Sequence, residues 1–385
     1  MKTKLILFSF FFLFFAAIAA FSPYLVIYFQ MRGYSGAQIG LLTGLTPLIT
    51  VVSVPIWTGL ADKTGRHSLI MALSLLLTIA GLLVFPYLHP FPAVLVALLL
   101  INILLAPVNA FANSAAVFML GDEKDRYGQV RLGGTIGYGL SALAVGLLVE
   151  SYDLKTAFWT AAGLIFLCFL VGLLFAFDNE GLEQAVEGSD FGKLIKSPTW
   201  AIFLLIALLG GVAMAMTNNY FYPYMSELGS RESAMGLALA VGTLSEIPVM
   251  LFANRFIGRF QAYGTMLIAL FFTALRMVLF GLTNDAGLVI AFQLLNGLTI
   301  PLLLVAGVDF ADDHAPRGLR TSAQGIFNTA VMGVGAGIGG FLGGLLLANI
   351  GGQALFLVIG LATFAGLLAV SLIGQRYDLG TTTRP

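Results

Sequence analysis

The feature that most constrains the fold is a succession of apolar runs of about 20 residues, which recur from one end of the chain to the other. A helix of this length crosses the hydrocarbon core of a bilayer, which is roughly 30 Å thick. The runs are continuous rather than alternating, which favours helices over the strands of a membrane barrel. Only 10% of the 385 residues are charged, whereas soluble domains carry about 25% charged residues. We therefore expect an all-α polytopic membrane protein.

Twelve of these runs are expected to span the membrane, and the Lys and Arg residues between them set the orientation. If the N-terminus is cytoplasmic, that side carries fifteen of the 19 Lys and Arg residues, whereas the other side carries Arg32, Lys155 and Arg231. This bias follows the positive-inside rule and requires an even number of spans. We expect both termini in the cytoplasm and the protein in the plasma (cytoplasmic or inner) membrane. The spans are expected at residues 5–29, 37–61, 67–88, 93–120, 130–149, 156–177, 199–226, 233–253, 262–283, 286–310, 318–348 and 352–374.

The longest polar segment of the chain divides the twelve spans into six and six. It is rich in acidic residues and occupies residues 178–198. We expect it to be a cytoplasmic linker that joins an N-terminal six-helix bundle at 1–177 to a C-terminal six-helix bundle at 199–385.

A sequence spacing that occurs once in each half indicates that the two halves are repeats. Pro55 precedes Gly65 by the same spacing as Pro248 precedes Gly258, and an arginine follows each glycine. Parallel repeats of six helices are the plan of a large class of transporters, whose substrate site lies near the midplane between the halves. The glycine-rich stretch from Gly333 to Gly344 predicts helices that approach each other closely in lipid.

Other classes of protein lack their expected sequence features. The single Cys168 excludes an internal disulfide and a cysteine-based metal site, and we expect neither a metal nor a cofactor. No basic patch with interleaved aromatic residues points to nucleic acid. No HExxH or Gly-x-Ser-x-Gly motif occurs, so an intramembrane enzyme is not expected. A signalling receptor is a further alternative, but the chain has no sizeable extramembrane domain to relay a signal.

Glu246 and Arg276 are the charged residues that lie deepest in the expected spans. A charge near the bilayer centre costs about 2.5–3.5 kcal/mol on insertion scales, so such residues face a cavity or a partner. A buried carboxylate without a partner binds a proton, and one beside a cation releases it. We expect Glu246 to be the proton-coupling acid and Arg276 its partner. The alternative is a buried ion pair with a purely structural role.

Uncharged polar residues share single faces of several expected spans, as the helical spacing of Asn109 and Asn113 illustrates. Such amides also join helices to one another in lipid. Together they favour a cavity that hydrogen-bonds a small polar solute and offers aromatic faces to it. The candidates for this substrate cavity are Asn109, Asn113, Asn218, Asn219, Tyr222, Gln293, Asn296 and Asn328.

The loop between the second and third expected spans reads TGLADKTGRHS, residues 58–68. It resembles the cytoplasmic signature loop of the major facilitator superfamily, with Thr58 and His67 as departures from the usual pattern. The resemblance implies a conformational latch that helps to hold the outward-facing state. The latch residues carried over are Asp62, Lys63, Gly65 and Arg66.

The segments RYGQVRLGGTIGYG (126–139) and QLLNGLTIPLLLVAG (293–307) look like the branch that contains lactose permease, phenylpropionate permease and nucleoside–proton symporters. This resemblance covers nearly the whole chain and implies roles in substrate binding and proton coupling for Arg131, Glu246 and Arg276. Tyr138 corresponds to the aromatic residue that stacks on sugar in lactose permease. The essential acidic and histidine positions of that permease fall on Asn113, Asn296 and Thr299.

We therefore expect a monomeric secondary transporter that moves a small organic solute across the lipid bilayer by alternating access, in symport with protons. A facilitator or a proton antiporter that exports amphipathic compounds is the alternative. Arg131 and Arg276 would suit a carboxylate, whereas the Asn, Gln and Tyr residues would suit a sugar or a nucleoside, so the sequence leaves the substrate open.

Overall fold

The structure is a computed structural model that describes residues 2–177, 197–315 and 319–377, and helices form the architecture of this part of the chain. Short 3₁₀ or π segments, labelled η, join several of the helices. The elements are α1 Lys2–Phe21, η1 Ser22–Tyr24, α2 Leu25–Met31, α3 Gly36–Thr64, α4 His67–Val84, η2 Phe85–Tyr87, α5 Phe91–Leu120, η3 Gly121–Arg126, α6 Tyr127–Ser151, α7 Lys155–Gly172, α9 Pro198–Glu227, α10 Glu232–Leu282, α11 Ala286–Phe292, η4 Gln293–Leu298, α12 Ile300–His314, α13 Arg320–Asn328, η5 Thr329–Gly335 and α14 Ala336–Arg376.

Ten helical stretches of the described chain are long and apolar enough to cross a membrane. Two of them, Glu232–Leu282 and Ser322–Arg376, contain 51 and 55 residues. Straight helices of that length would measure roughly 75–80 Å, more than twice the hydrocarbon core of a bilayer. Both are broken by a residue with positive φ: Gln261 at +58° in α10 and Gly351 at +76° in α14. Each break directly precedes the start of an expected span, at 262 and 352.

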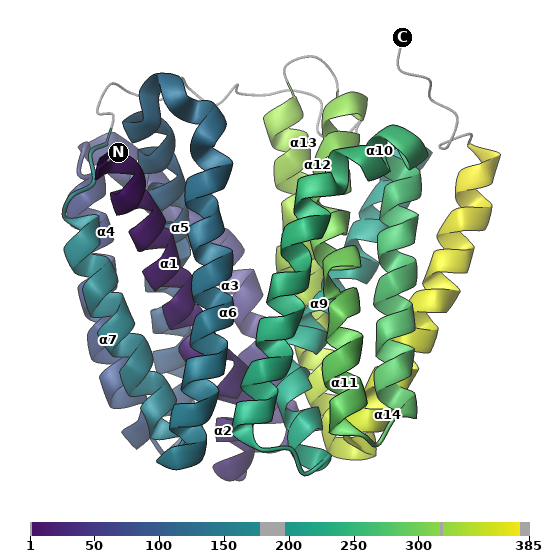
Figure 1. The fold of residues 1–385 in the computed structure, drawn as a ribbon, viewed down its shortest axis with the longest axis horizontal. Helices are drawn as coiled ribbons and strands as arrows, with labels where there is room; N and C mark the ends of the chain where they lie inside the picture. Colours follow the sequence, from purple (N-terminus) through teal and green to yellow (C-terminus); the bar gives the residue numbers. More distant parts are fainter. Residues whose placement is uncertain (1, 178–196, 316–318, 378–385) are drawn as a thin grey trace.

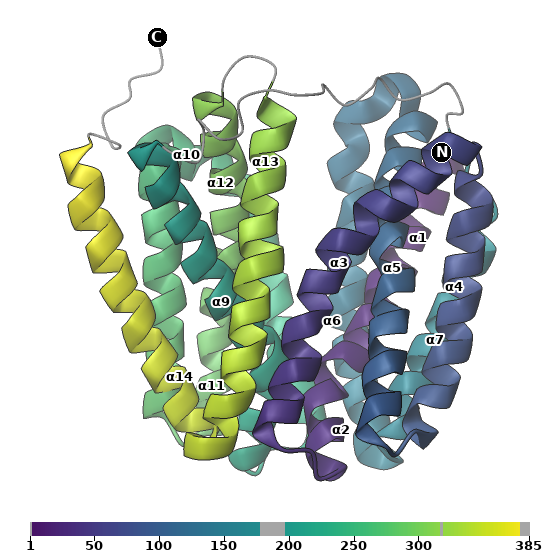
Figure 2. The same cartoon turned by 180° about the vertical axis from the view of Figure 1, so that it is seen from behind.

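The helices form two groups that are in contact at one end and separate at the other (Figures 1 and 2). The first group contains α1 to α7 and the second contains α9 to α14. The start of α1 and the end of α14 lie on the side where the groups separate, at the top of Figure 1. In Figure 2, α3 leans from the first group towards α14 at the opposite end.

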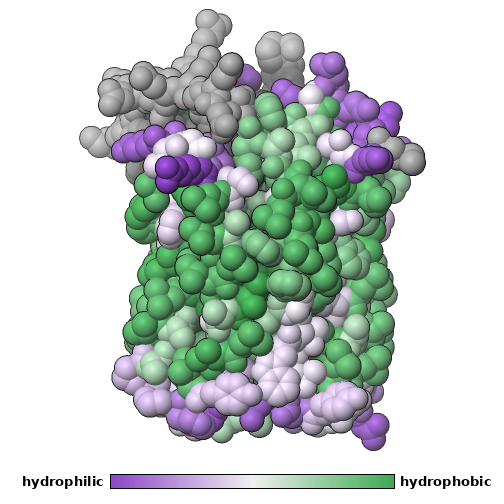
Figure 3. Space-filling model, turned by 90° about the vertical axis from the view of Figure 1, so that its left-hand side faces the viewer, coloured by the Kyte–Doolittle hydropathy of each residue, from purple (hydrophilic) through white to green (hydrophobic). Residues whose placement is uncertain are grey.

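The outer surface is suited to lipid. Figure 3 shows a broad apolar band over the helices, with hydrophilic residues gathered at both ends of the molecule. Large apolar side chains such as Leu140, Leu147 and Leu170 are exposed on it. A continuous apolar surface of this extent is unfavourable in water and favourable in a bilayer. The protein is therefore a multi-pass membrane protein.

Two glycine-lined seams close the end where the groups meet. In the first seam, Gly36, Gly40 and Gly44 repeat every four residues along α3 and face α14. A Cβ atom at Gly40 would lie 2.5 Å from the carbonyl oxygen of Phe341, and one at Gly340 would lie 2.6 Å from the carbonyl oxygen of Thr43. The backbones therefore touch directly, and the close approach predicted for Gly333 to Gly344 is confirmed.

The first seam also contains a buried polar contact. The Thr43 hydroxyl donates to the carbonyl oxygen of Gly340 at 2.9 Å and lies 2.8 Å from the Tyr220 hydroxyl, which contacts the same carbonyl. Thr43 belongs to α3 in the first group, and its two partners belong to α9 and α14 in the second. Because all three polar groups are buried and satisfied, separating the groups here requires water to replace these bonds.

The second seam joins α6 to the start of α10. A Cβ atom at Gly146 would lie 2.7 Å from the carbonyl oxygen of Glu232, and Gly236 packs as closely on Ala142. At its outer end, the Glu150 carboxylate accepts a bond of 3.1 Å from the Ser233 backbone N–H. A carboxylate at this position satisfies a free N–H group and complements the helix dipole at the start of α10.

Candidate functional site

A cavity of about 490 Å³ lies between the two groups of helices. Its wall is supplied by α1, η1 and α6 from the first group and by α9, α10, η4, α12 and η5 from the second. Eight of the residues predicted from the sequence lie on this wall: Arg131, Tyr138, Asn218, Tyr222, Glu246, Arg276, Gln293 and Asn296. They come from four different elements, α6, α9, α10 and η4, so the fold brings together residues that are up to 165 positions apart, the separation of Arg131 and Asn296.

Glu246 and Arg276 are connected through the side-chain amide of Asn296. The Nδ2 group of Asn296 donates to Oε1 of Glu246 at 2.7 Å, and its Oδ1 accepts a bond from Nη1 of Arg276. The orientation of the amide is fixed chemically, because the carboxylate requires a donor and the guanidinium requires an acceptor. The charge of Glu246 and the charge of Arg276 therefore act on each other through one rigid amide.

The amide of Asn296 has little capacity left for a solute. Its second Nδ2 bond goes to the carbonyl oxygen of Gly242 at 3.2 Å, and its Oδ1 is also 3.5 Å from the Thr299 hydroxyl. A primary amide has two donors and two acceptor positions; both donors and the acceptor position facing Arg276 are occupied, while the Thr299 hydroxyl donates its hydrogen to the Asn296 backbone carbonyl at 2.5 Å. Asn296 is thus placed to hold Glu246 and Arg276 rather than to bind what enters the cavity.

The backbone of η4 explains why two amides meet the same guanidinium. Gln293 and Asn296 lie three residues apart in this 3₁₀ segment, where side chains at i and i+3 are eclipsed. Nη1 of Arg276 donates to Oε1 of Gln293 at 3.1 Å as well as to Asn296. Close packing on α10 holds η4 in place, since a Cβ atom at Gly297 would collide with the carbonyl oxygen of Ser245. The sequence places these amides on one face but does not show that this face receives Arg276.

Arg276 is one of the large side chains that are fully buried in the described part of the chain, with 2% of its surface exposed. Its guanidinium lies 5.7 Å from the centre of the Phe280 ring, and its Nε has no hydrogen-bond partner among the described residues. A buried guanidinium that binds neutral amides keeps its full positive charge inside the wall. Glu246, which is partly exposed to the cavity, is the carboxylate linked to it through Asn296.

Arg131 lies on the opposite wall, one turn into α6. Its guanidinium stacks on two aromatic rings of α1, 4.2 Å from the centre of Phe15 and 5.1 Å from that of Phe11. Gly134 makes room for it, because a Cβ atom there would lie 2.7 Å from Nη1 of Arg131. No carboxylate of the described residues lies within 4.0 Å of this guanidinium. Sequence reasoning selected Arg131 but not the aromatic rings that hold it.

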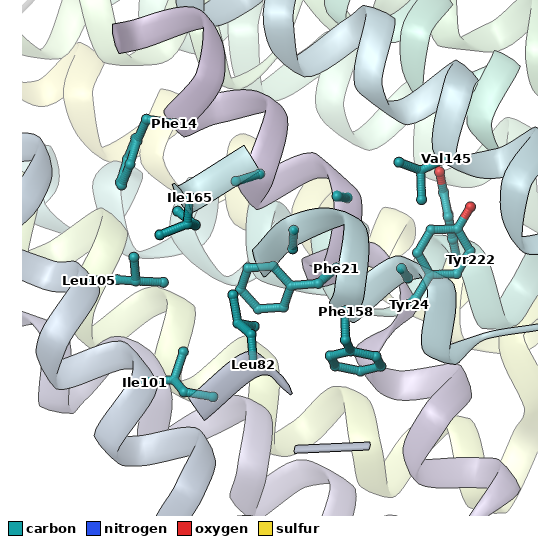
Figure 4. Packing of buried hydrophobic residues seen from close by; sticks show 14 of the residues in the cluster. Phe14, Phe21, Tyr24, Leu82, Ile101, Leu105, Val145, Phe158, Ile165 and Tyr222 are labelled. Atoms are coloured by element: carbon teal, nitrogen blue, oxygen red, sulfur yellow. The ribbon is translucent and has the colours of Figure 1, made fainter. Parts of the chain in front are cut away.

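A tyrosine ring of the cavity wall is supported by a second ring behind it. Tyr222, from α9, lines the cavity, and the buried Tyr24, from η1, packs edge to face on it with ring centres 5.0 Å apart. Figure 4 shows these two rings side by side, with Val145 next to them and the phenylalanine cluster around Phe21 and Phe158 on the other side. Tyr222 was predicted from the sequence, whereas Tyr24 was not. The Pro23 that precedes it, where α1 gives way to η1, was the available signal.

Four other predicted residues do not line the cavity, and their assignment to it is corrected here. Asn113 accepts a bond of 2.9 Å from the Tyr127 hydroxyl and so joins α5 to α6. Asn109 lies on the same helix, and its Oδ1 is buried without a partner among the described residues. Asn219 points about 100° away from its neighbour Asn218, as successive helical residues do. Asn328 is exposed at the end of α13.

The predicted latch residues lie at the turn between α3 and α4. Gly65 ends α3 with a φ of +64°, a conformation that favours glycine, and Arg66 directly precedes α4. Asp62 pairs with His67 at 2.8 Å, so a residue that departs from the signature pattern supplies its partner. Lys63 and Arg66 are exposed. The latch role itself stays a prediction.

The fold and this site define a class of protein. A multi-pass helical membrane protein with a polar cavity between two groups of helices is built to move a small molecule across the membrane without altering it. The protein is such a transporter rather than an enzyme. The chain belongs to the MFS_1 like family, whose model matches residues 5–358. The superfamily expected from the signature loop is thereby confirmed.

Known proteins similar to this chain are permeases and transporters. Over 369 residues it is 26% identical to the maltose permease of Geobacillus stearothermophilus, covering 95% of this chain and 93% of the permease. The xanthosine permease of Escherichia coli (strain K12) is 24% identical, with 81% of this chain and 80% of that protein covered. The crystal structure of the nucleoside transporter NupG has the same fold, with a TM-score of 0.86, 20% sequence identity, and coverage of 97% of this chain and 99% of that chain.

Proposed function

We propose that this transporter is a proton-coupled symporter that carries a small organic solute into the cytoplasm by alternating access. The observation that carries the proposal is the chain from Glu246 through Asn296 to Arg276 on the cavity wall. A carboxylate at membrane depth is costly and exchanges protons as its partners change. A proton on Glu246 removes the negative charge that Arg276 faces, and so changes what the cavity attracts.

We propose twelve spans with both termini in the cytoplasm, in a monomer located in the plasma membrane. The breaks at Gln261 and Gly351 support this count, since each divides an overlong helix into two lengths that suit a bilayer. The excess of Lys and Arg on the side of the termini supports the orientation. The division into bundles at 1–177 and 199–385, joined by a linker at 178–198 that lies largely outside the described residues, agrees with the two groups of helices (Figure 1).

We infer the state of the transport cycle from the sealed end. Both glycine seams lie on the side away from the termini, and the groups separate on the side of the termini (Figures 1 and 2). With cytoplasmic termini this arrangement is inward-facing. The opposite state then requires Thr43 to leave Gly340 and Gly146 to leave Glu232, while the other ends of the groups come together.

A proton antiporter that exports amphipathic compounds is the second candidate. The apolar part of the cavity wall favours it, because Met214, Met250 and Met332 are flexible side chains that adapt to varied solutes. Symport and antiport differ in the direction of proton movement. Addition of solute to the outside of proteoliposomes makes the lumen more acidic in symport and more alkaline in antiport.

The proposal is tested with Glu246→Gln in proteoliposomes. Maltose, xanthosine, uridine and a set of organic acids are first screened for thermal stabilisation of the purified protein, since a solute that binds the folded state stabilises it. For a solute that binds, we expect the variant to exchange it across the membrane but not to accumulate it under an inward proton gradient. Glu123→Gln, which changes an exposed carboxylate that does not line the cavity, is the matched control. Uphill accumulation by Glu246→Gln at the rate of the control contradicts the proposal.

A further inference from the structure

We propose that Arg131 is an anion subsite and that the transported solute is an organic monocarboxylate. This rests on the proposed function, because it names the solute of the same cavity. Three observations lead to it: the environment of Arg131, the balance of charges on the cavity wall, and the shape and polarity of the rest of that wall.

The guanidinium of Arg131 is held in place but not neutralised. Two phenylalanine rings pack against it, and the space that a side chain at position 134 would occupy is left to it. Stacking on aromatic rings fixes the plane of a guanidinium and leaves its N–H groups free at the edge. Tyr127, one turn earlier, donates its hydroxyl hydrogen to Asn113 and accepts a hydrogen bond from Arg131 with its oxygen, so it holds the guanidinium without neutralising it. The neighbours of Arg131 are thus aromatic or neutral.

The charges on the cavity wall do not cancel. The wall carries the two guanidinium groups of Arg131 and Arg276 and the single carboxylate of Glu246, a formal net charge of +1. Glu246 is already committed to the Asn296 amide that holds Arg276. A charge without a counter-charge at membrane depth is unfavourable, and proteins place such charges where a ligand or ion completes the pair. Arg131 is the group that is left for the solute.

A carboxylate is the anion that suits this subsite. One guanidinium presents two parallel N–H groups that match the two oxygens of a carboxylate. The excess charge is a single one, which one monoanion balances. Around it, Phe15, Phe221, Leu239 and Met332 supply apolar surface for the body of the solute. The solute that fits is a monocarboxylate with an apolar or aromatic body.

Charge balance over the transport cycle agrees with this assignment. A proton on Glu246 together with a monocarboxylate at Arg131 leaves the cavity at the same net charge as the empty protein. A proton together with a neutral solute would raise that charge by one during the step in which the site crosses the membrane. Symport of a proton with a monocarboxylate moves no net charge, so an imposed membrane potential should not drive it.

The test compares acids with amides of the same shape. Binding of indole-3-acetate and hexanoate is measured on the purified full-length protein by thermal stabilisation, in parallel with indole-3-acetamide and hexanamide. We expect stabilisation by an acid and none by its amide at equal concentration. Arg131→Gln should weaken acid binding by about tenfold or more, the loss expected for a charge-assisted bond. Arg131→Lys, which keeps the charge without the two parallel donors, should retain part of the affinity.

Arg255→Gln is the matched control, because Arg255 also stacks on a phenylalanine ring, at 4.7 Å from Phe252, but is exposed and does not line the cavity. The second readout is uptake of the acid into proteoliposomes with a potassium diffusion potential set by valinomycin, which should leave the proton-driven rate unchanged. The proposal is overturned if no acid stabilises the protein more than its amide, if Arg131→Gln binds acids as the control does, or if an inside-negative potential drives uptake. Proton-coupled accumulation of uridine or maltose without binding of acids would overturn the monocarboxylate and leave the proposed symport standing.

Discussion

Glu246 and Arg276 share one amide: the side chain of Asn296 donates to the carboxylate at 2.7 Å and accepts from the guanidinium. The two charged groups therefore sense each other through a neutral residue that is itself tied to the backbone of α10 at Gly242. When the carboxylate takes up a proton, Arg276 therefore keeps its hydrogen bonds to the neutral amides of Asn296 and Gln293. It also makes the amide as important as the charges that it joins.

Replacement of Asn296 should uncouple transport from protons while leaving the cavity open to solute. Asn296→Ala removes the bonds of the amide to both charged residues, so Glu246 and Arg276 lose their connection and the pH dependence of uptake should flatten. Solute binding should change by less than about threefold, because both donors of the amide and its acceptor position facing Arg276 are already occupied. The pH profile of uptake is compared with that of Asn102→Ala, which removes an amide that donates to the carbonyl oxygen of Leu98 in its own helix. An unchanged profile in Asn296→Ala would remove the residue from the coupling machinery.

Removal of one charge of the site should destabilise the protein more than removal of both. In Arg276→Gln the carboxylate of Glu246 is left without a cation, and a single loss of this kind costs roughly 3–5 kcal/mol in fully buried pairs. The double variant Glu246→Gln/Arg276→Gln should recover part of that loss. The double-mutant cycle is followed by thermal unfolding in detergent, and additivity of the two single changes would show that the charges act independently.

Enlargement of one seam glycine should open the sealed end. A methyl group at Gly40 meets the carbonyl oxygen of Phe341 at 2.5 Å, closer than any real contact, so α3 must move away from α14. We expect Gly40→Ala to increase the labelling of a cysteine placed at the buried Val145 by an impermeant maleimide added from outside. The native Cys168 is buried and should not interfere. Gly163→Ala, which has no atom within 4 Å of the added methyl group, should label as slowly as the parent.

The outer end of the second seam should depend on Glu150 as a hydrogen-bond acceptor and much less as a charge. Its carboxylate accepts from the Ser233 N–H at 3.1 Å, whereas Arg231 lies 3.7 Å away with an 82% exposed side chain. Exposed ion pairs contribute about 0–1 kcal/mol. Glu150→Ala should therefore raise the labelling rate at Val145, while Glu150→Gln, which keeps an acceptor oxygen, and Arg231→Gln should change it little. Equal increases of the labelling rate in all three variants would show that the charge of Glu150, and not its hydrogen bond with Ser233, holds the seam together.

The sequence was sufficient for features that depend on local pattern. The length of the apolar runs places the breaks before residues 262 and 352, and the spacing of glycines identifies faces where helices touch. The rarity of charge in lipid singles out Glu246 and Arg276. Each of these inferences uses residues within one or two helices, whose geometry is the same in any fold.

The remaining features depend on which faces meet. Helical spacing shows that Asn109 and Asn113 share a face, but not that this face packs inside the first group instead of facing the cavity. The contact of Thr43 with Tyr220 joins positions 177 residues apart, and neither residue is unusual within its own helix. In the same way, the eclipsed positions of Gln293 and Asn296 depend on a 3₁₀ segment that an apolar run does not reveal.

The backbone contact between Gly40 and Phe341 has a consequence for the speed and sharpness of the conformational change. Side chains at an interface yield gradually, because they can change rotamer while contact is kept. Two backbones that touch have no such adjustable part, and their attraction fades within about an ångström of separation. We therefore expect the seam to open in one step, from packed to separated. A transporter sealed in this way exposes its cavity to one side or the other, and gives the solute and its proton few chances to leak through separately.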